Sequence, residues 1–194
     1  MKGRSFLKIV FLDAEVTGEH AKTTLVSVGM VTIEGESLYI TLNDYDREQV
    51  YPWLEEHVLS SIDESKSVTS AKAFELISKW LSKYSGGDEI RLVSAGLGAD
   101  LFLVFELYKY AYPERKFFHA LHCLPDFINH SKHIDLNTLF QVAGLDPGLN
   151  RAEFAEEEGD VRRHDALSDA MVVRKCFMKL VRLPQLRNLL SKQQ

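Results

Sequence analysis

The chain has 194 residues, a length that suggests one domain running from residue 1 to residue 194. Hydrophobic residues make up 45% and charged residues 26%, a balance that excludes disordered, collagen-like and coiled-coil proteins. The formal net charge of −5 excludes a polybasic protein held on nucleic acid mainly by phosphate neutralisation, although a local site could still act on nucleic acid.

The cysteine content and the beginning of the chain predict a cytoplasmic protein. Cys123 and Cys176 are too few for a disulfide framework, so a reducing compartment is expected. No segment is long and apolar enough to span a membrane, so no membrane partner is expected. Met1–Leu12 resembles a signal peptide only superficially, because Lys8 interrupts its apolar run and Asp13 ends it, and we interpret it as a strand.

The first half of the chain predicts a meander followed by helices. Three segments rich in β-branched and apolar residues are expected to pair as antiparallel strands: Phe6–Glu15, Thr24–Ile33 and Leu38–Leu42. A short helix is predicted over Pro52–Leu59. A longer helix is predicted over Ser70–Tyr84, because its apolar residues share one face and Gly86 and Gly87 follow it.

The second half alternates strands and helices. The predicted elements are a strand at Arg91–Ala95, an apolar helix at Asp100–Tyr110, a strand at His133–Leu136 running into a helix through Ala143, and a helix at Ala166–Leu180. Pro184 separates a helical tail, residues 184–194, from a core of about residues 7–180. This order predicts the α/β class, with a mixed central β-sheet flanked by helices.

Four acidic residues lie at positions where the predicted strands and helices would normally carry apolar residues. Because side chains alternate along a strand, Asp13 and Glu15 share the face of Ile9 and Phe11. Helical spacing likewise places Asp100 and Asp169 at the head of apolar stripes.

Such acids repel one another and lose hydration unless a cation neutralises them, and hard oxygen ligands select Mg²⁺ or Mn²⁺. Taken singly, each acid has a simpler explanation. Asp100 and Asp169 could stabilise helix N-termini, and Asp13 and Glu15 could be the polar end of a strand. The four together favour a metal-binding cluster at one edge of the sheet.

Two segments carry a family resemblance. Asp13-Ala14-Glu15-Val16-Thr17-Gly18 resembles the Asp-x-Glu-x-Thr-Gly motif of the DEDDh, DnaQ-like 3′-to-5′ exonucleases, and His164-Asp165-Ala166-Leu167-Ser168-Asp169 resembles their His-x-x-x-x-Asp motif. The segment around Asp100 keeps the Asp of the second family motif and the apolar residues that follow it, but it lacks the Asn of that motif. The resemblance covers roughly Leu7–Leu180 and implies a ribonuclease-H-like fold.

The resemblance also implies a mechanism and a substrate. It implies two Mg²⁺ or Mn²⁺ ions held by Asp13, Glu15, Asp100 and Asp169, with His164 as general base and Glu15 also positioning the attacking water. The implied substrates are 3′ ends of single-stranded RNA or DNA, released as nucleoside 5′-monophosphates. The chain further resembles small bacterial exoribonucleases similar to oligoribonuclease and ribonuclease T, which implies RNA as substrate and a homodimer.

Several other residues give weaker signals. Thr17, Gly18 and Arg163 are candidate substrate-binding residues, although a plain turn or a solvated loop explains them about as well. The histidines and the cysteine within residues 119–133 have a spacing that faintly resembles a zinc site. Trp53 and Trp80 are interpreted as core or interface residues.

Two other functions remain open. The chain could be a catalytically silent nucleic-acid-binding module on the same fold, against which the four intact motif residues argue. It could also be a two-metal phosphoesterase that acts on a small nucleotide.

Overall fold

The computed structural model describes residues 8–96, 98–115, 128, 132–156 and 164–190. Its centre is a mixed five-stranded sheet of order β3-β2-β1-β4-β5. The strands are β1 (Lys8–Val16), β2 (Leu25–Thr32), β3 (Ser37–Thr41), β4 (Ile90–Ser94) and β5 (Ile134–Asp135). The first three form the expected antiparallel meander, while β4 and β5 run parallel to β1. The α/β prediction with a mixed sheet is confirmed.

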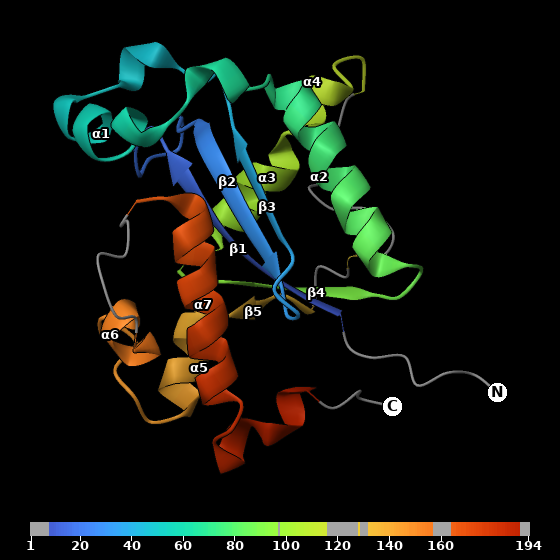
Figure 1. Cartoon of the computed structure of the whole chain (residues 1–194), viewed down its shortest axis with the longest axis vertical. Coiled ribbons are helices and arrows are strands. Elements are labelled where there is room, and N and C mark those ends of the chain that lie inside the picture. Colours follow the sequence, from blue (N-terminus) through green and yellow to red (C-terminus); the bar gives the residue numbers. More distant parts are fainter. Residues whose placement is uncertain (1–7, 97, 116–127, 129–131, 157–163, 191–194) are drawn as a thin grey trace.

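Helices cover both faces of the sheet (Figure 1). The α-helices are α1 (Pro52–His57), α2 (Ser70–Ser85), α3 (Ala99–Glu106), α4 (Tyr108–Ala111), α5 (Leu136–Val142), α6 (Arg151–Ala155) and α7 (Ala166–Leu180). Helix α7 packs on one face with α5 and α6, and α2, α3 and α4 pack on the other. None of the helices described is long and apolar enough to cross a membrane.

The alternation along β1 divides the core into two halves. Val10 and Leu12 are buried against α2, α3 and α4. Ile9 and Phe11 are buried against α7, where the rings of Phe11 and Phe177 meet edge to face with centroids 5.2 Å apart. The face that continues into Asp13 and Glu15 is therefore the face that α7 covers.

Local capping fixes the two longest helices where the sequence predicts them. The Thr69 side chain accepts a hydrogen bond from the Lys72 N–H at the beginning of α2, and Gly86 ends that helix with φ 56°. The Asp165 carboxylate accepts a hydrogen bond of 2.8 Å from the Ser168 N–H, so α7 begins at Ala166 as expected.

Some boundaries differ from the prediction. The helix predicted over Asp100–Tyr110 is two helices, because the chain tightens at Leu107 and the Tyr110 N–H donates to the Leu107 carbonyl oxygen, a one-turn i→i+3 bond. The strand predicted over His133–Leu136 contains only Ile134–Asp135, because the Asp135 side chain caps α5 immediately afterwards. The described part of the predicted helical tail is a 3₁₀ helix, Pro184–Leu190, and residues 191–194 lie outside the described part of the chain.

Candidate metal centre

The carboxylates of β1 project beyond the end of the neighbouring strand. Strand β4 pairs with β1 only along Lys8–Phe11, so Asp13 and Glu15 extend past the carboxyl end of β4. The chain then turns through Gly96 and Gly98, both with positive φ, into α3 and Asp100. Ligands bind in open α/β sheets at this carboxyl edge, where successive connections diverge.

A glycine on β2 lets α7 reach the same place. Gly29 is the register partner of Asp13, and a Cβ at position 29 would lie 2.2 Å from the carbonyl oxygen of Ala166. The first turn of α7 therefore rests directly on the backbone of β2. Because Asp169 lies in this first turn, the close contact brings its carboxylate to Asp13.

The predicted cluster forms around three of the four acids. Carboxylate oxygens of Asp13, Glu15 and Asp169 all lie within 4.8 Å of one another, and all three residues are half-buried. Burial is the first cause that raises each pKa, and repulsion from neighbouring acids adds to it: the acids of the group and Asp100 for Asp13 and Glu15, and Asp165 for Asp169. The pKa of Asp13 rises well above its ordinary value, and that of Glu15 rises to about 7.

Asp100 lies next to this group without joining it. Its negative charge raises the pKa of Asp13 and of Glu15, so it is within electrostatic reach of both. Burial raises its own pKa to about 6. It does not belong to the three-residue group whose oxygens lie within 4.8 Å. Asp100 is thus placed as an outlying fourth acid, on α3.

The donor set fits a divalent cation. Oxygens bound to one Mg²⁺ ion lie between about 3 and 4.2 Å apart, and the three carboxylate oxygens here lie within 4.8 Å of one another. Oxygen-only ligands select hard cations, and a divalent ion would neutralise the negative charge that these buried carboxylates carry when ionised. Among the residues the structure describes, this is the only group of histidines, cysteines or acids with metal-ligand spacing.

The His and Cys cluster suggested by the sequence is largely untested. Residues 119–127, 130 and 131 lie outside the described part of the chain, and only His133 of its histidines is described. The ring Nε2 of His133 lies 2.9 Å from the Ser94 hydroxyl oxygen, so this side chain is paired with the end of β4.

His164 lies beside the acids, at the entrance to α7. It has φ 63°, a left-handed conformation that non-glycine residues adopt infrequently, and it is half-buried. Its charge lowers the pKa of Asp169. Its ring meets the ring of Trp53 nearly at a right angle, with centroids 4.7 Å apart.

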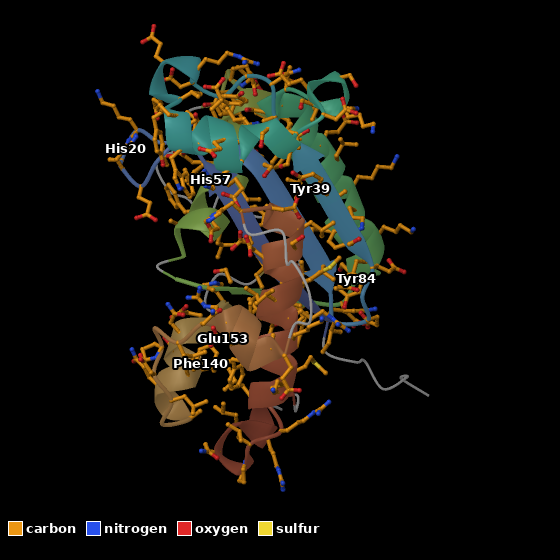
Figure 2. All side chains as sticks on the ribbon, turned by 60° about the vertical axis from the view of Figure 1, so that its left-hand side comes forward. His20, Tyr39, His57, Tyr84, Phe140 and Glu153 are labelled. Carbon is orange, nitrogen blue, oxygen red and sulfur yellow. The ribbon has the colours of Figure 1, made fainter. Side chains whose placement is uncertain are left out.

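Helix α1 therefore supplies aromatic residues that the sequence interpretation missed. Trp53 is 41% exposed and is not a core residue, and it stacks with Tyr51 and with His57. Figure 2 shows His57 on the side of α1 that faces the beginning of α7. The available sequence signal was the i, i+4 spacing of Trp53 and His57. Trp80, by contrast, packs against the core as interpreted.

A second missed residue is a cation near the acids. The positive charge of Arg151, at the beginning of α6, lowers the pKa values of Asp13 and Asp169. Its guanidinium donates a hydrogen bond of 2.8 Å to the Asn137 side chain on α5. No local sequence pattern identifies this arginine, because its proximity to β1 depends on how α6 packs on α7.

The candidate substrate-binding residues lie at different places. The Thr17 hydroxyl is buried and donates a hydrogen bond of 2.7 Å to Gln49 Oε1, so it holds the loop after β1. The Gly18 N–H donates to the Thr23 hydroxyl at 3.2 Å. Arg163 lies outside the described residues.

No family model matches the sequence, and a search among curated proteins finds no match. Solved structures do match. The magnesium- and manganese-bound form of Pop2p from S. pombe has a TM-score of 0.60 at 13% identity, covering 92% of this chain and 84% of that one. The zinc-bound complex of E. coli ExoI with single-stranded DNA has a TM-score of 0.65 at 13% identity, covering 94% of this chain.

The catalytic unit of Pan2 from Neurospora crassa, which contains a protease and a nuclease domain, matches at 14% identity with a TM-score of 0.53. The chain covers only 42% of the ExoI chain and 28% of the Pan2 chain. At these identities the likeness concerns the fold. Together with the strand order and the helical layers, it shows that the chain has the ribonuclease-H-like α/β fold.

Proposed function

We propose that the protein is a metal-dependent 3′-to-5′ exonuclease of the DEDDh superfamily, acting on single-stranded nucleic acid and releasing nucleoside 5′-monophosphates. The observation that carries this proposal is the group of Asp13, Glu15 and Asp169 carboxylates beside His164. The fold supports it, since one similar structure binds Mg²⁺ and Mn²⁺ and another is an exonuclease with single-stranded DNA.

The acids would hold two divalent ions. Asp13, Glu15 and Asp169 form the central ligand group, and Asp100 adds a fourth carboxylate from the side of α3. When bound, a pair of ions supplies Lewis-acid stabilisation of the attacking and leaving oxygens in an in-line displacement at phosphorus. The protein contributes a rigid arrangement, because β1 and α7 are both fixed in the core.

His164 would act as the general base. An imidazole titrates near neutrality, so it can accept the proton of the attacking water and later release it to solvent. Its place before the first turn of α7 puts it next to Asp169 without using it as a ligand. Glu15 is held on β1 within the carboxylate group, and its proposed second role is to position the attacking water.

The surroundings of the site suit a single strand. Tyr51, the residue before α1, is 45% exposed, and an aromatic ring of this kind stacks with bases whatever their identity. The backbone at Thr17 and Gly18, together with Arg163, is proposed to contact the terminal nucleotide. We further propose RNA as the preferred substrate, in keeping with the resemblance to small exoribonucleases.

An oligonucleotide assay tests this function. A 5′-labelled single strand is incubated with the protein and Mn²⁺, in matched ribose and deoxyribose forms. We expect a ladder that shortens from the 3′ end, slow cutting of a strand blocked by a 3′-phosphate, and faster cutting of ribose. A gel shift without cleavage would indicate a silent binding module. The absence of both cleavage and a gel shift would favour a phosphoesterase. A circular strand cut as fast as a linear one would indicate an endonuclease.

The role of His164 is tested with His164→Ala. Because the acids bind the metal without it, the variant should bind Mn²⁺ like wild type in isothermal titration. Its rate should fall by about 10²–10⁴, the usual contribution of a positioned general base. A near wild-type rate with the same acidic limb in the pH–rate profile would exclude His164 as the base.

A homodimer is also proposed, on the resemblance to small exoribonucleases. Phe102 and Tyr110, which are 53% and 47% exposed on α3 and α4, offer apolar surface for such a contact. Light scattering after size exclusion should give a mass near twice 22.1 kDa. A monomer mass at micromolar concentration would refute this part of the proposal.

A further inference from the structure

Helix α1 packs against β2 in a way that holds the rings of Trp53 and His57 in place. Leu54 and Val58, spaced i and i+4, are only 2% and 1% exposed and pack with Val26 of β2. Trp53 and His57 form the adjacent i, i+4 row, with ring centroids 4.7 Å apart and planes within 12° of parallel. The Nδ1–H of His57 donates to the Trp53 carbonyl oxygen at 2.9 Å, which fixes the orientation of the His57 ring.

Among the described residues, few contacts other than those with Trp53 and His57 hold the His164 ring. It precedes the helical hydrogen bonds of α7, and its backbone already lies in the left-handed region. Within the described part of the chain its imidazole makes no hydrogen bond. Its ring contacts are instead perpendicular ones, with Trp53 at 4.7 Å and 78° and with His57 at 6.4 Å and 89°. Edge-to-face contacts of this kind are preferred geometries for aromatic pairs.

We propose that Trp53, supported by His57, is a positioning residue that holds the His164 imidazole in the orientation needed to take a proton from the attacking water. The indole touches no reacting atom in this role and acts only through His164. The proton transfer rests on the proposed function, whereas the ring contact does not.

A different role for Trp53 would be direct stacking on a substrate base, and the two roles predict different kinetics. A stacking ring contributes binding, so its removal raises KM and does so whether or not His164 is present. A positioning ring contributes through His164, so its removal lowers kcat and has no further effect once His164 is gone. Residues that act as one unit are non-additive in this way.

A double-mutant cycle therefore decides between them. The variants are Trp53→Ala, Trp53→Phe, His164→Ala and the double variant Trp53→Ala with His164→Ala, and Trp80→Phe is the matched control on α2. We expect Trp53→Ala to lower kcat by about 10-fold or more, as a misplaced catalytic group does, with KM changed less than about threefold. Trp53→Phe should recover most of the rate, because it keeps a ring at that position.

In the His164→Ala background, Trp53→Ala should change kcat by less than about twofold. The proposal is overturned if Trp53→Ala costs the same factor in both backgrounds, or if its only effect is on KM. If the alanine variant folds poorly, Trp53→Phe replaces it in the cycle: whatever part of the rate this variant loses should be lost only when His164 is present, and an equal loss in both backgrounds would overturn the proposal.

A second readout needs no substrate and no activity. The side-chain NMR signals of His164, assigned by their loss in His164→Ala, should move toward those of an exposed histidine in Trp53→Ala and only part of the way in Trp53→Phe. Unchanged His164 signals in Trp53→Ala would overturn the proposal. If wild-type protein cleaves no oligonucleotide, the proposed function fails, while this measurement still decides whether Trp53 holds the ring.

Discussion

Replacing Gly29 by alanine should disable the site from the neighbouring strand, β2, on the same face of the sheet. The added Cβ would lie 2.2 Å from the carbonyl oxygen of Ala166 and 2.4 Å from the Cα of Leu167, whereas real Cβ atoms essentially never come within 3.0 Å of such atoms. Both neighbours are backbone, so no side chain can swing away. The first turn of α7 must therefore move from β2 by about 1 Å.

That displacement has two measurable consequences. Asp169 moves with the turn and leaves the 4.8 Å group, and a misplacement of about 1 Å at reacting groups costs on the order of 10²-fold in rate. Overpacking of this kind also costs about 1–3 kcal/mol of the free energy of unfolding, or roughly 2–12 °C in Tm for a chain of this size.

The assays are Mn²⁺ titration, oligonucleotide cleavage and thermal unfolding of Gly29→Ala. Gly148→Ala is the matched control, since a Cβ there meets only the Asp146 side chain, at 3.3 Å, and the backbone has no positive φ. We expect the control to behave as wild type. If Gly29→Ala is folded and keeps the metal affinity and cleavage rate of Gly148→Ala, the contact between α7 and β2 does not position the site.

Three further outcomes follow from the acids. Asp13→Asn should abolish Mn²⁺ binding in isothermal titration and raise the Tm of the metal-free protein by relieving repulsion; unchanged affinity would contradict the ligand assignment. Asp100→Asn should weaken Mn²⁺ binding less than Asp169→Asn, because Asp100 lies outside the close group, and the reverse ranking would contradict its outlying place. The Tm in EDTA should fall as the pH rises from about 5 to 8, because folding raises the pKa of Glu15 from 4.5 to about 7 and the folded protein then holds a proton that the unfolded chain has lost. Glu15→Gln should flatten this dependence of Tm on pH. A flat profile for the wild type would contradict the raised pKa of Glu15 in the metal-free folded protein.

The parts of the site that the sequence predicted correctly depend on local regularities. Strand alternation put Asp13 and Glu15 on the face of Ile9 and Phe11, and that face is the one that α7 covers. Helical spacing put Asp169 on the inward stripe of α7, whose first residue was correct because Asp165 caps it. Such features are encoded within a few residues of where they appear.

Asp100 shows where local reasoning becomes insufficient. The apolar stripe behind it predicted a helix, and a helix begins at Ala99. The distance from its carboxylate to Asp13, Glu15 and Asp169 depends on the turn through Gly96 and Gly98. No pattern of apolar residues specifies the backbone conformations of these two glycines. The predicted continuation to Tyr110 also failed, because the buried Leu107 packs where the chain tightens. Tertiary packing, rather than helix propensity, decided both points.

The contact between α1 and His164 could not have been predicted from either segment alone. Leu54 and Val58 anchor α1 on the sheet, and Gly29 lets the beginning of α7 approach the same strand, β2. Trp53 and His164 meet because α1 and α7 pack independently against the same strand, β2. A tryptophan on a short helix usually indicates burial, but here burial is supplied by Leu54, which leaves the indole free to face the site. The exposed aromatic residue therefore follows from how the core is divided along α1, and its position beside His164, the proposed general base, would give that exposure a chemical use.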